Sequence, residues 1–308
     1  MKKKIAVIGS SNIDFIMKMP RLPKVGETIT DGVFFQTFGG KGANQAVGAA
    51  RAGGNVSFVN CVGDDDITPR MVDQFNKAGI NTDFVFQEKN ISSGTALVMI
   101  GDLGTNYLSV APGANYRLTP RHIDKVLDLI KEAEIIVLQY EILPETLKYV
   151  LDVCHQRKKR VLWNFAPARE FDRSYLKKVE ILVVNESEAE YISGIAVADD
   201  ASVSKAATEI ARLGCETVII TIGARGSFIY SANGERWVDA FKVNALDTTG
   251  AGDIYCGCLA VALVEGKDIS EAVRFATAGA AISVTRLGAQ PSAPTRGEIE
   301  NFLRTASP

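Results

Sequence analysis

From about residue 114 onward, short runs of β-branched and aliphatic residues alternate with stretches that have helical periodicity. The predicted strands are 135–138, 160–163, 181–184 and 217–222, and the predicted helices are 119–133, 144–157, 186–193 and 201–213. Strands that are apolar on both faces and separated by helices are typical of a mostly parallel sheet covered by helices on both sides. We therefore predict one doubly wound, Rossmann-like α/β domain over residues 1–308.

Two segments break this pattern because apolar and polar residues alternate along them. The predicted hairpins pair 15–19 with 33–37, and 95–100 with 106–110, with the second turn at 102–106. Alternation gives a strand one side that faces water or a ligand. We predict a small antiparallel β lid, inserted at about 15–37 and 93–112. Edge hairpins without function are the alternative.

Three phenylalanines on the predicted lid strands bear on assembly. An exposed sheet would leave Phe15, Phe34 and Phe35 in water. A second lid would cover this apolar surface, and covering it would also protect the sheet edges. We predict a homodimer formed through the lids.

Composition and charge narrow the class of protein. The 308 residues are 46% hydrophobic and 23% charged, with a net charge of −2, so no basic face is available for nucleic acid. No run approaches the roughly 20 apolar residues of a membrane helix, and the apolar start at 5–8 is broken too early for a secretory leader. The five cysteines lack metal-ligand spacing and are expected to be reduced. We expect a cytoplasmic protein whose partner is a small molecule.

The segment with the clearest chemistry is 247–253, Asp-Thr-Thr-Gly-Ala-Gly-Asp, followed by an apolar helix at 254–264. Glycines at 250 and 252 let the backbone approach a ligand, and the free N–H groups of the helix start point back at the loop. Such a loop suits a phosphate whose charge grows in the transition state. Asp253, in the first helical turn, is placed to act as a base. A plain strand-to-helix turn is the alternative.

Two further polar segments lie near the N-terminus. Residues 38–46 form a second glycine-rich loop before a small-residue helix at 43–52, without the spacing of a Walker A sequence. Lys41 and Asn44 there offer ammonium and amide donors. Residues 9–14 end the first strand, where open α/β sheets bind ligands, and Asn12 with Asp14 suits vicinal hydroxyls. By itself, an Asx turn explains this last segment equally well.

The motifs at 39–44, Gly-Gly-Lys-Gly-Ala-Asn, and at 247–253 resemble the two signatures of the ribokinase-like (pfkB) carbohydrate kinases. Segments 139–141, 185–188, 221–226 and 285–292 are similar to that family as well, so the resemblance spans nearly the whole chain. It implies a kinase that moves the γ-phosphoryl group of ATP to a sugar hydroxyl, with O5 of D-ribose as the expected acceptor. Kinases for 2-deoxyribose, a nucleoside or a hexose remain alternatives.

The resemblance also implies roles for individual residues. It makes Asp253 the base, with the backbone amides of Gly250, Ala251, Gly252 and Asp253 as the anion hole. The implied sugar ligands are Asn12, Asp14, Gly40, Lys41, Asn44, Glu141 and Asp253. The implied ATP contacts are Asn185, Thr221, Gly223, Gly226, Gly252 and Thr277, with Glu188 ordering Mg²⁺ through water.

Ribokinase-like enzymes imply one further site, for an activating monovalent cation such as K⁺ beside the anion hole. The matching positions are the side chain of Asp247, the carbonyls of Thr249, Ser283, Arg286 and Gly288, and the hydroxyl of Ser292. Carbonyl oxygens suit a large, weakly hydrated cation.

Two other function classes fit these residues less well than a kinase does. A sugar or nucleotide binder without catalysis would be expected to lack the base or the loop glycines, and both are present. A Rossmann dehydrogenase needs Gly-x-Gly-x-x-Gly after the first strand, which residues 9–14 do not supply.

One residue departs from the family pattern, because Tyr140 places a bulky side chain next to Glu141. Adjacent strand residues, however, point to opposite faces. His122 and His155 match no motif and are expected to be ordinary helix residues.

Overall fold

The computed structural model describes residues 2–101 and 106–306, so most of the predicted turn at 102–106 lies outside the described residues. Within that part of the chain, one sheet has the strand order β13-β12-β11-β10-β9-β8-β1-β4-β5. Its strands are β1 (Lys4–Ile8), β4 (Asn55–Val62), β5 (Val85–Gln87), β8 (Ile135–Leu138), β9 (Arg160–Asn164), β10 (Ile181–Asn185), β11 (Thr217–Thr221), β12 (Ser227–Ser231) and β13 (Gly234–Val238). From β5 to β11 neighbouring strands pair in parallel, and only β12 and β13 pair antiparallel.

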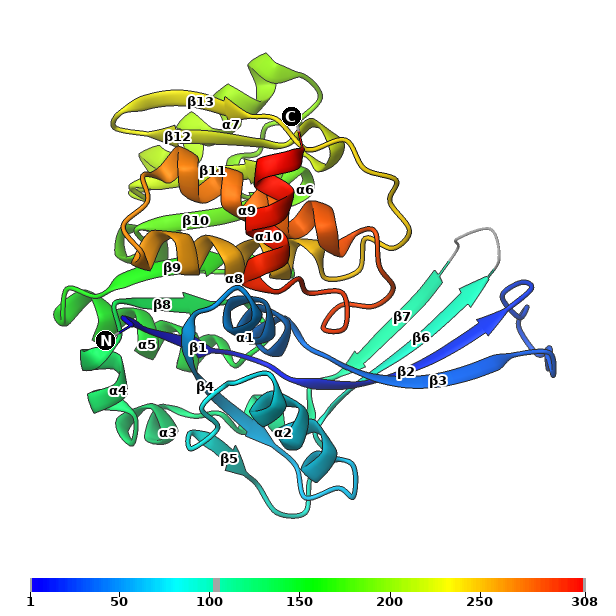
Figure 1. Cartoon of the computed structure of the whole chain (residues 1–308). Helices are drawn as coiled ribbons and strands as arrows, with labels where there is room; N and C mark the ends of the chain where they lie inside the picture. The colour runs from blue at the N-terminus through cyan, green and yellow to red at the C-terminus, as the bar shows by residue number, and fades with distance from the viewer. Residues whose placement is uncertain (1, 102–105, 307–308) are drawn as a thin grey trace.

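Helices cover both faces of this sheet (Figure 1). One face packs against α1 (Lys41–Arg51), α2 (Thr68–Lys77), α8 (Ala251–Val264), α9 (Ile269–Ser283) and α10 (Arg296–Thr305). The other packs against α3 (Pro120–Asp124), α4 (Leu127–Glu132), α5 (Pro144–Gln156), α6 (Glu186–Ser193) and α7 (Asp200–Arg212), with the 3-10 turns η1 (Gly113–Arg117) and η2 (Arg173–Lys178). A third such turn, η3 (Gly223–Arg225), follows β11. The predicted doubly wound architecture is confirmed.

The strand β1 explains why the sheet is buried on both sides. Ile5 and Val7 belong to the core cluster on the α8 face, while Ala6 and Ile8 belong to the cluster on the α5 face. Successive side chains of a strand point to opposite faces, so an unbroken apolar run fills both cores. None of the described helices is long and apolar enough to cross a membrane.

The predicted single helix at 119–133 is wrong, because the segment forms two short helices, α3 and α4. The backbone leaves the helical conformation at Val126 (φ −116°, ψ 17°), whose side chain is buried in the core. A change of backbone conformation at one residue does not alter the hydrophobic periodicity of the segment. Burying the Val126 side chain stabilises the fold more than continuing the helix would. His122 has a local structural role, as expected, since its Nδ1 accepts a hydrogen bond from the Thr119 N–H at the helix start (3.2 Å).

The lid is a four-stranded sheet of order β3-β2-β6-β7 that projects from the main body (Figure 1). Its strands are β2 (Asn12–Met19), β3 (Val33–Gly39), β6 (Gly94–Gly101) and β7 (Asn106–Ala111). Both predicted hairpins are antiparallel, while β2 and β6, which join them, run parallel. Because β2 follows β1 after three residues, the lid begins directly at the carboxyl edge of the main sheet.

The topology places a ligand site at that edge. The strand β1 has β8 on one side and β4 on the other, so the chain changes direction in the sheet at this point. Crevices at the carboxyl ends of strands beside such a switch point are where open α/β sheets bind ligands.

Candidate active site

The anion loop lies at the N-terminus of α8. Gly250 caps this helix with φ +73°, and the described hydrogen bonds leave the backbone N–H groups of Gly250, Gly252 and Asp253 unused, whereas the Ala251 N–H donates to the Thr248 carbonyl (3.2 Å). A Cβ on Gly250 would lie 2.6 Å from the Ala289 Cβ, whereas a Cβ on Gly252 would meet nothing within 4 Å. Gly250 is therefore required for the turn, and Gly252 leaves open space beside the free amides for a bound anion.

Asp253 is the third residue of α8, directly after the loop, and is buried, with 6% of its surface exposed. Its Oδ2 accepts a hydrogen bond from Asn44 Nδ2 (2.9 Å), and its Oδ1 accepts one from Gln45 Nε2 (3.0 Å). The negative charge of Asp253 also raises the pKa of Lys41, at the start of α1. The two glycine-rich motifs thus meet in space, although more than 200 residues separate them.

The sugar-binding residues predicted near the N-terminus gather around the start of α1. The Glu141 Oε2 atom accepts hydrogen bonds from Ser10 Oγ (2.5 Å) and from the Lys41 backbone N–H (2.9 Å). Gly40 has φ +86°, and a Cβ there would lie 2.6 Å from the Ser11 Cα, so the loop touches the end of β1. Glu141 therefore joins β8 to α1 and balances the positive end of the helix.

Asn12 and Asp14 reach the same place from β2. The Asn12 Oδ1 atom accepts a hydrogen bond from Asn115 Nδ2 (2.9 Å), which sets the orientation of its amide. Burial, and then the charge of Glu141, raise the pKa of Asp14 to about 7. Its Oδ1 is buried without a hydrogen-bond partner. Such an orphaned oxygen suits a ligand hydroxyl.

Tyr140 does not crowd this cluster. Its ring is 1% exposed and packs edge-on against Trp163 (5.8 Å between centroids), and its hydroxyl donates to the Glu170 carbonyl (2.9 Å). The side chain therefore points into the core on the α5 face, although Tyr140 and Glu141 lie beyond the end of β8 at Leu138, so strand alternation does not decide its direction.

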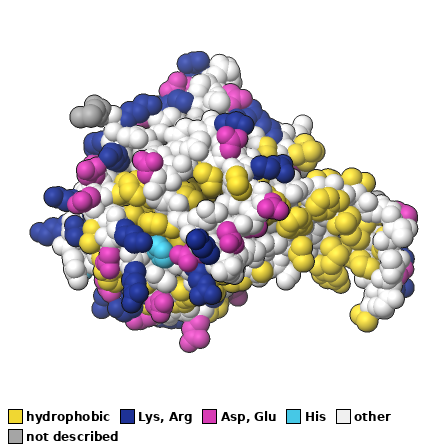
Figure 2. All heavy atoms as spheres, turned by 90° about the horizontal axis from the view of Figure 1, so that it is seen from below, with side chains coloured by type: hydrophobic (Ala, Val, Ile, Leu, Met, Phe, Trp, Pro, Cys, Tyr) yellow, Lys and Arg dark blue, Asp and Glu magenta, His cyan; other side chains and the backbone are white. Residues whose placement is uncertain are grey.

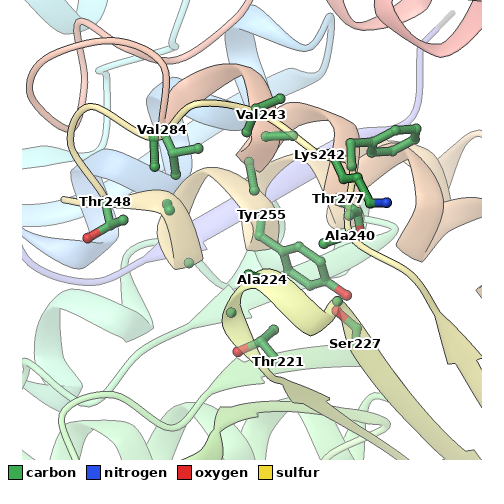
Figure 3. A pocket seen from close by; sticks show the side chains of 18 of the residues that line it. Thr221, Ala224, Ser227, Ala240, Lys242, Val243, Thr248, Tyr255, Thr277 and Val284 are labelled. Carbon is green, nitrogen blue, oxygen red and sulfur yellow. The ribbon is translucent and has the colours of Figure 1, made fainter. Parts of the chain in front are cut away.

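A cavity of about 650 Å³ opens on the other side of the anion loop (Figure 3). Its lining includes five predicted nucleotide contacts, Thr221, Gly223, Gly226, Gly252 and Thr277. Its apolar wall is formed by Val243, Tyr255, Ala280, Ala281 and Val284. A cavity lined both by apolar side chains and by glycine backbone fits a nucleotide, which has a base and phosphates.

Asn185 and Glu188 do not line the cavity itself. They form a capping box at the start of α6, where the Glu188 N–H donates to Asn185 Oδ1 and the Asn185 N–H to Glu188 Oε2 (both 2.9 Å). Asn185 pairs in register with Thr221, which does line the cavity. Burial raises the pKa of Glu188, whose charge is among those that act on Lys41.

A model of the "pfkB family carbohydrate kinase" family matches residues 2–296. The chain belongs to this family. A ribokinase of Haemophilus influenzae is 38% identical over 306 residues, covering 99% of this chain and all of the relative. A deoxyribokinase of Salmonella typhi is 37% identical over 300 residues, covering 97% and 98%.

Two solved structures show the same pfkB fold. A ribokinase from Thermotoga maritima aligns with a TM-score of 0.90 at 38% identity, covering 98% of this chain and all of that one. An Arabidopsis thaliana ribokinase, complexed with ribose and ATP, aligns with a TM-score of 0.93 at 30% identity and covers 99% of each chain. This chain is accordingly a phosphotransferase that acts on a sugar hydroxyl.

The cation ligands expected in a ribokinase-like enzyme partly converge. Asp247 accepts hydrogen bonds from the N–H groups of Thr249 (2.9 Å) and Gly288 (2.8 Å). Burial by itself would raise the pKa of Asp247, but these hydrogen bonds outweigh it and hold that pKa below its ordinary value. The Ser283 carbonyl accepts from the Arg286 N–H (3.0 Å), and Ser292 Oγ donates to the Ala289 carbonyl (2.7 Å).

Five polar residues of this pfkB site carried no predicted role: Ser10, Gln45, Asn115, Gln139 and Asn164. Ser10, Gln45 and Gln139 lie inside or beside the recognised motifs, and Asn164 ends β9, so a polar residue at a strand end was an available signal. Asn115 belongs to a 3-10 turn far from either motif, and nothing local in the sequence indicates its role.

Proposed function

We propose that this enzyme transfers the γ-phosphoryl group of ATP to the terminal O5 hydroxyl of D-ribose, giving ribose 5-phosphate. The observation that carries the proposal is the position of Asp253. Its buried carboxylate lies in the first turn of α8, beside the anion loop, and accepts a hydrogen bond from Asn44 on α1, while Lys41 at the start of α1 is acted on by the charges of both Asp253 and Glu141. The ribose and ATP bound by the Arabidopsis relative support the choice of substrates.

Each part of the site has a task in this reaction. Asp253 accepts the proton of the attacking hydroxyl, and the amides of the anion loop, of which those at Gly250 and Gly252 take part in no described hydrogen bond, stabilise charge on the transferred phosphoryl group. Asn44 and Lys41 hold the acceptor end of the site, where Lys41 contributes positive charge. The lid closes over the sugar and excludes water, which would otherwise accept the phosphoryl group.

Two ions belong to the proposal. Glu188 would order Mg²⁺ through water, and the described hydrogen bonds leave its Oε1 unused. Mg²⁺ supplies charge neutralisation between the phosphates when it is bound. Asp247, Ser292 and the carbonyls of Thr249, Ser283, Arg286 and Gly288 would hold K⁺, and no described hydrogen bond uses the Thr249, Arg286 or Gly288 carbonyls. Equal activity with and without K⁺ and Na⁺ would contradict the second site.

Assembly and location complete the proposal. The lid carries exposed apolar side chains, among them Phe34, Tyr107 and Leu108, which a second lid would cover in a homodimer. The five cysteines are free and buried, which fits a reducing cytoplasm. Fractionation of the source cells tests the location.

A substrate panel tests the proposed function. ADP release is measured with Mg-ATP and K⁺ in the presence of ribose, 2-deoxyribose, fructose or adenosine. We expect kcat/KM to be highest for ribose. The deoxyribokinase relative makes 2-deoxyribose the second candidate, and a preference for it would move the assignment to deoxyribokinase. No turnover with any acceptor would overturn the proposal.

A further inference from the structure

A chain of buried amide side chains ends on the carboxylate of Asp253. Gln45, on α1, is fully buried, and its Nε2 donates both to Asp253 Oδ1 (3.0 Å) and to Asn164 Oδ1 (3.1 Å). Its Oε1 accepts a hydrogen bond from Gln139 Nε2 (2.6 Å). Gln139 is also fully buried, at the end of β8, and Asn164 is 7% exposed, at the end of β9.

The orientation of these amides is determined from one end. The Asn164 Nδ2 group donates to the backbone carbonyl of Val183 (3.2 Å), which can only accept. The Asn164 Oδ1 atom must therefore face Gln45, and it requires the NH₂ group of Gln45 rather than its oxygen. Gln139 follows this orientation, because the Gln45 Oε1 atom then accepts from its NH₂ group, while the Gln139 Oε1 atom is buried without a hydrogen-bond partner.

This arrangement commits both hydrogens of the Gln45 amide. One goes to Asn164 and the other to Asp253, so Gln45 presents only a donor to the carboxylate. A donor at Oδ1 cannot take up a proton from Asp253, and Asn44 likewise presents a donor at Oδ2. The amides hold the carboxylate at a single rotation while leaving the remaining lone pairs for the acceptor hydroxyl.

We propose that Gln45, oriented by Asn164 and Gln139, is a positioning residue for the catalytic base, and that it fixes the Asp253 carboxylate in the rotation needed for proton transfer. The inference rests on the proposed function and deepens it. Gln45 is fully buried and its amide is committed to Asp253, Asn164 and Gln139, so it acts through Asp253. Its contribution should therefore appear in kcat, since sugar and nucleotide contacts remain in place.

The test is a double-mutant cycle with the variants Gln45→Met, Asp253→Ala and the double variant. Methionine keeps the length and volume of the side chain but has no hydrogen to donate. We expect Gln45→Met to lower kcat about 10- to 100-fold, the effect of one lost hydrogen bond to a charged group, with both KM values within about threefold. In the Asp253→Ala background the same change should alter the residual rate by less than about twofold.

Controls separate positioning from folding. Gln87→Met lies on β5, the outermost strand of the large sheet, and should leave kcat unchanged. Gln139 lies one amide further from the base, so Gln139→Met should lower kcat by a smaller factor of about 2–10. This variant tests the inference if Gln45→Met does not fold. The inference is overturned if the Gln45→Met effect falls on KM, or if it persists undiminished without Asp253.

A readout that does not depend on turnover distinguishes this inference from the proposed function. In ¹⁵N-labelled protein, the side-chain NH₂ of Gln45 is assigned from its loss in Gln45→Met. Asp253→Ala should shift these resonances and speed their hydrogen exchange at least about tenfold, because one protecting hydrogen bond is removed. Unchanged resonances would overturn the positioning role even if the wild type phosphorylates ribose. Shifted resonances would support that role even if ribose is not the substrate.

Discussion

At the level of single residues, the two aspartates of the site have opposite surroundings. Asp253 receives an amide donor at each carboxylate oxygen, from Asn44 and from Gln45. Asp14 is buried with one oxygen unpartnered and with the charge of Glu141 nearby, and its pKa is raised to about 7. The first environment suits a base that must stay in one orientation, and the second suits a carboxyl that waits for a ligand.

Asp253→Asn removes the base and should lower kcat by roughly 10²–10⁴, the usual range for general-base removal. The KM for the sugar should stay within about threefold, because the other sugar contacts are unchanged. Steady-state kinetics with varied sugar measures both quantities. The new amide also faces a donor at one oxygen position, so Asp253→Ala serves as the comparison without that conflict. Near-normal turnover in both variants would remove Asp253 from its assigned role.

Sugar affinity should depend on pH through Asp14. Because its pKa is raised to about 7, the free protein holds this carboxyl protonated below pH 7 and ionised above it. Sugar hydroxyls donate to an ionised carboxylate more strongly than to a neutral acid, so binding favours the ionised form. Calorimetry should therefore show the affinity rising with pH up to about 7 and levelling off above it.

The matched variant for this pH effect is Asp14→Asn, which cannot titrate. Its affinity should be about 10- to 100-fold weaker than that of the wild type at pH 8, and flat with pH. A wild-type affinity that does not change between pH 5.5 and 8 would contradict the role of Asp14.

At the level of elements, the site depends on how closely α1 and α8 cross. A Cβ on Gly257 would lie 2.5 Å from the Gln45 carbonyl oxygen and 2.6 Å from the Ala49 nitrogen, and a Cβ on Gly48 would lie 3.2 Å from the Ile254 Cα. Glycine in both helices thus allows backbone contact between them. That contact brings Asn44 and Gln45, one turn before Gly48, within hydrogen-bond distance of Asp253.

Gly257→Ala should push the two helices apart. We expect a loss of about 1–3 kcal/mol in the free energy of unfolding, the usual cost of overpacking, together with a lower kcat from the displaced amides. Urea unfolding and steady-state kinetics measure the two effects. Gly297→Ala, on α10, is the matched control because its Cβ would meet nothing within 4 Å, and it should leave both unchanged or slightly raise stability. If Gly257→Ala lowers the free energy of unfolding and kcat no more than Gly297→Ala does, the close crossing of α1 and α8 is unimportant.

At the level of the whole molecule, the lid is apolar on both faces. Strand register places Phe35, Val98 and Leu108 on the face that carries Asp14, and Phe34, Met99 and Tyr107 on the other. One face can cover the bound sugar, but the second then remains in water. In Figure 2 hydrophobic side chains gather over the part of the lid that adjoins the main body, whereas charged groups are scattered over the main body.

The second apolar face predicts a lid-mediated dimer that a single charge should break. Phe34, which is 55% exposed and stacks on Phe15, is the residue to change. Sedimentation velocity at micromolar concentration should give a dimer for the wild type and a monomer for Phe34→Glu. Tyr191→Glu, on α6 and away from the lid, should remain a dimer. A wild type that sediments as a monomer at every concentration would contradict the prediction.

Much of the fold could be read from the sequence, because its signals are local. An apolar run such as 135–138 between helical stretches needs both faces buried, whichever neighbours it acquires. The anion loop was also predictable, since Gly250 adopts a positive φ that other residues resist and Gly252 leaves open space beside the loop. Two features of α3 could not be read from hydrophobic periodicity. One is its capping by His122, and the other is its separation from α4 at the buried Val126.

The sequence by itself determined the doubly wound class, the paired hairpins and the family, and it indicated Asp253 as the proposed base, because each depends on residue types at short spacing. Only the tertiary structure decided which groups surround that base. Gln45, Asn164 and Gln139 come from α1, β9 and β8, and the amide chain that they form exists only once the sheet order brings those elements together. Hydrogen bonds act over about 3 Å, whereas separation along the chain says nothing about distance in space.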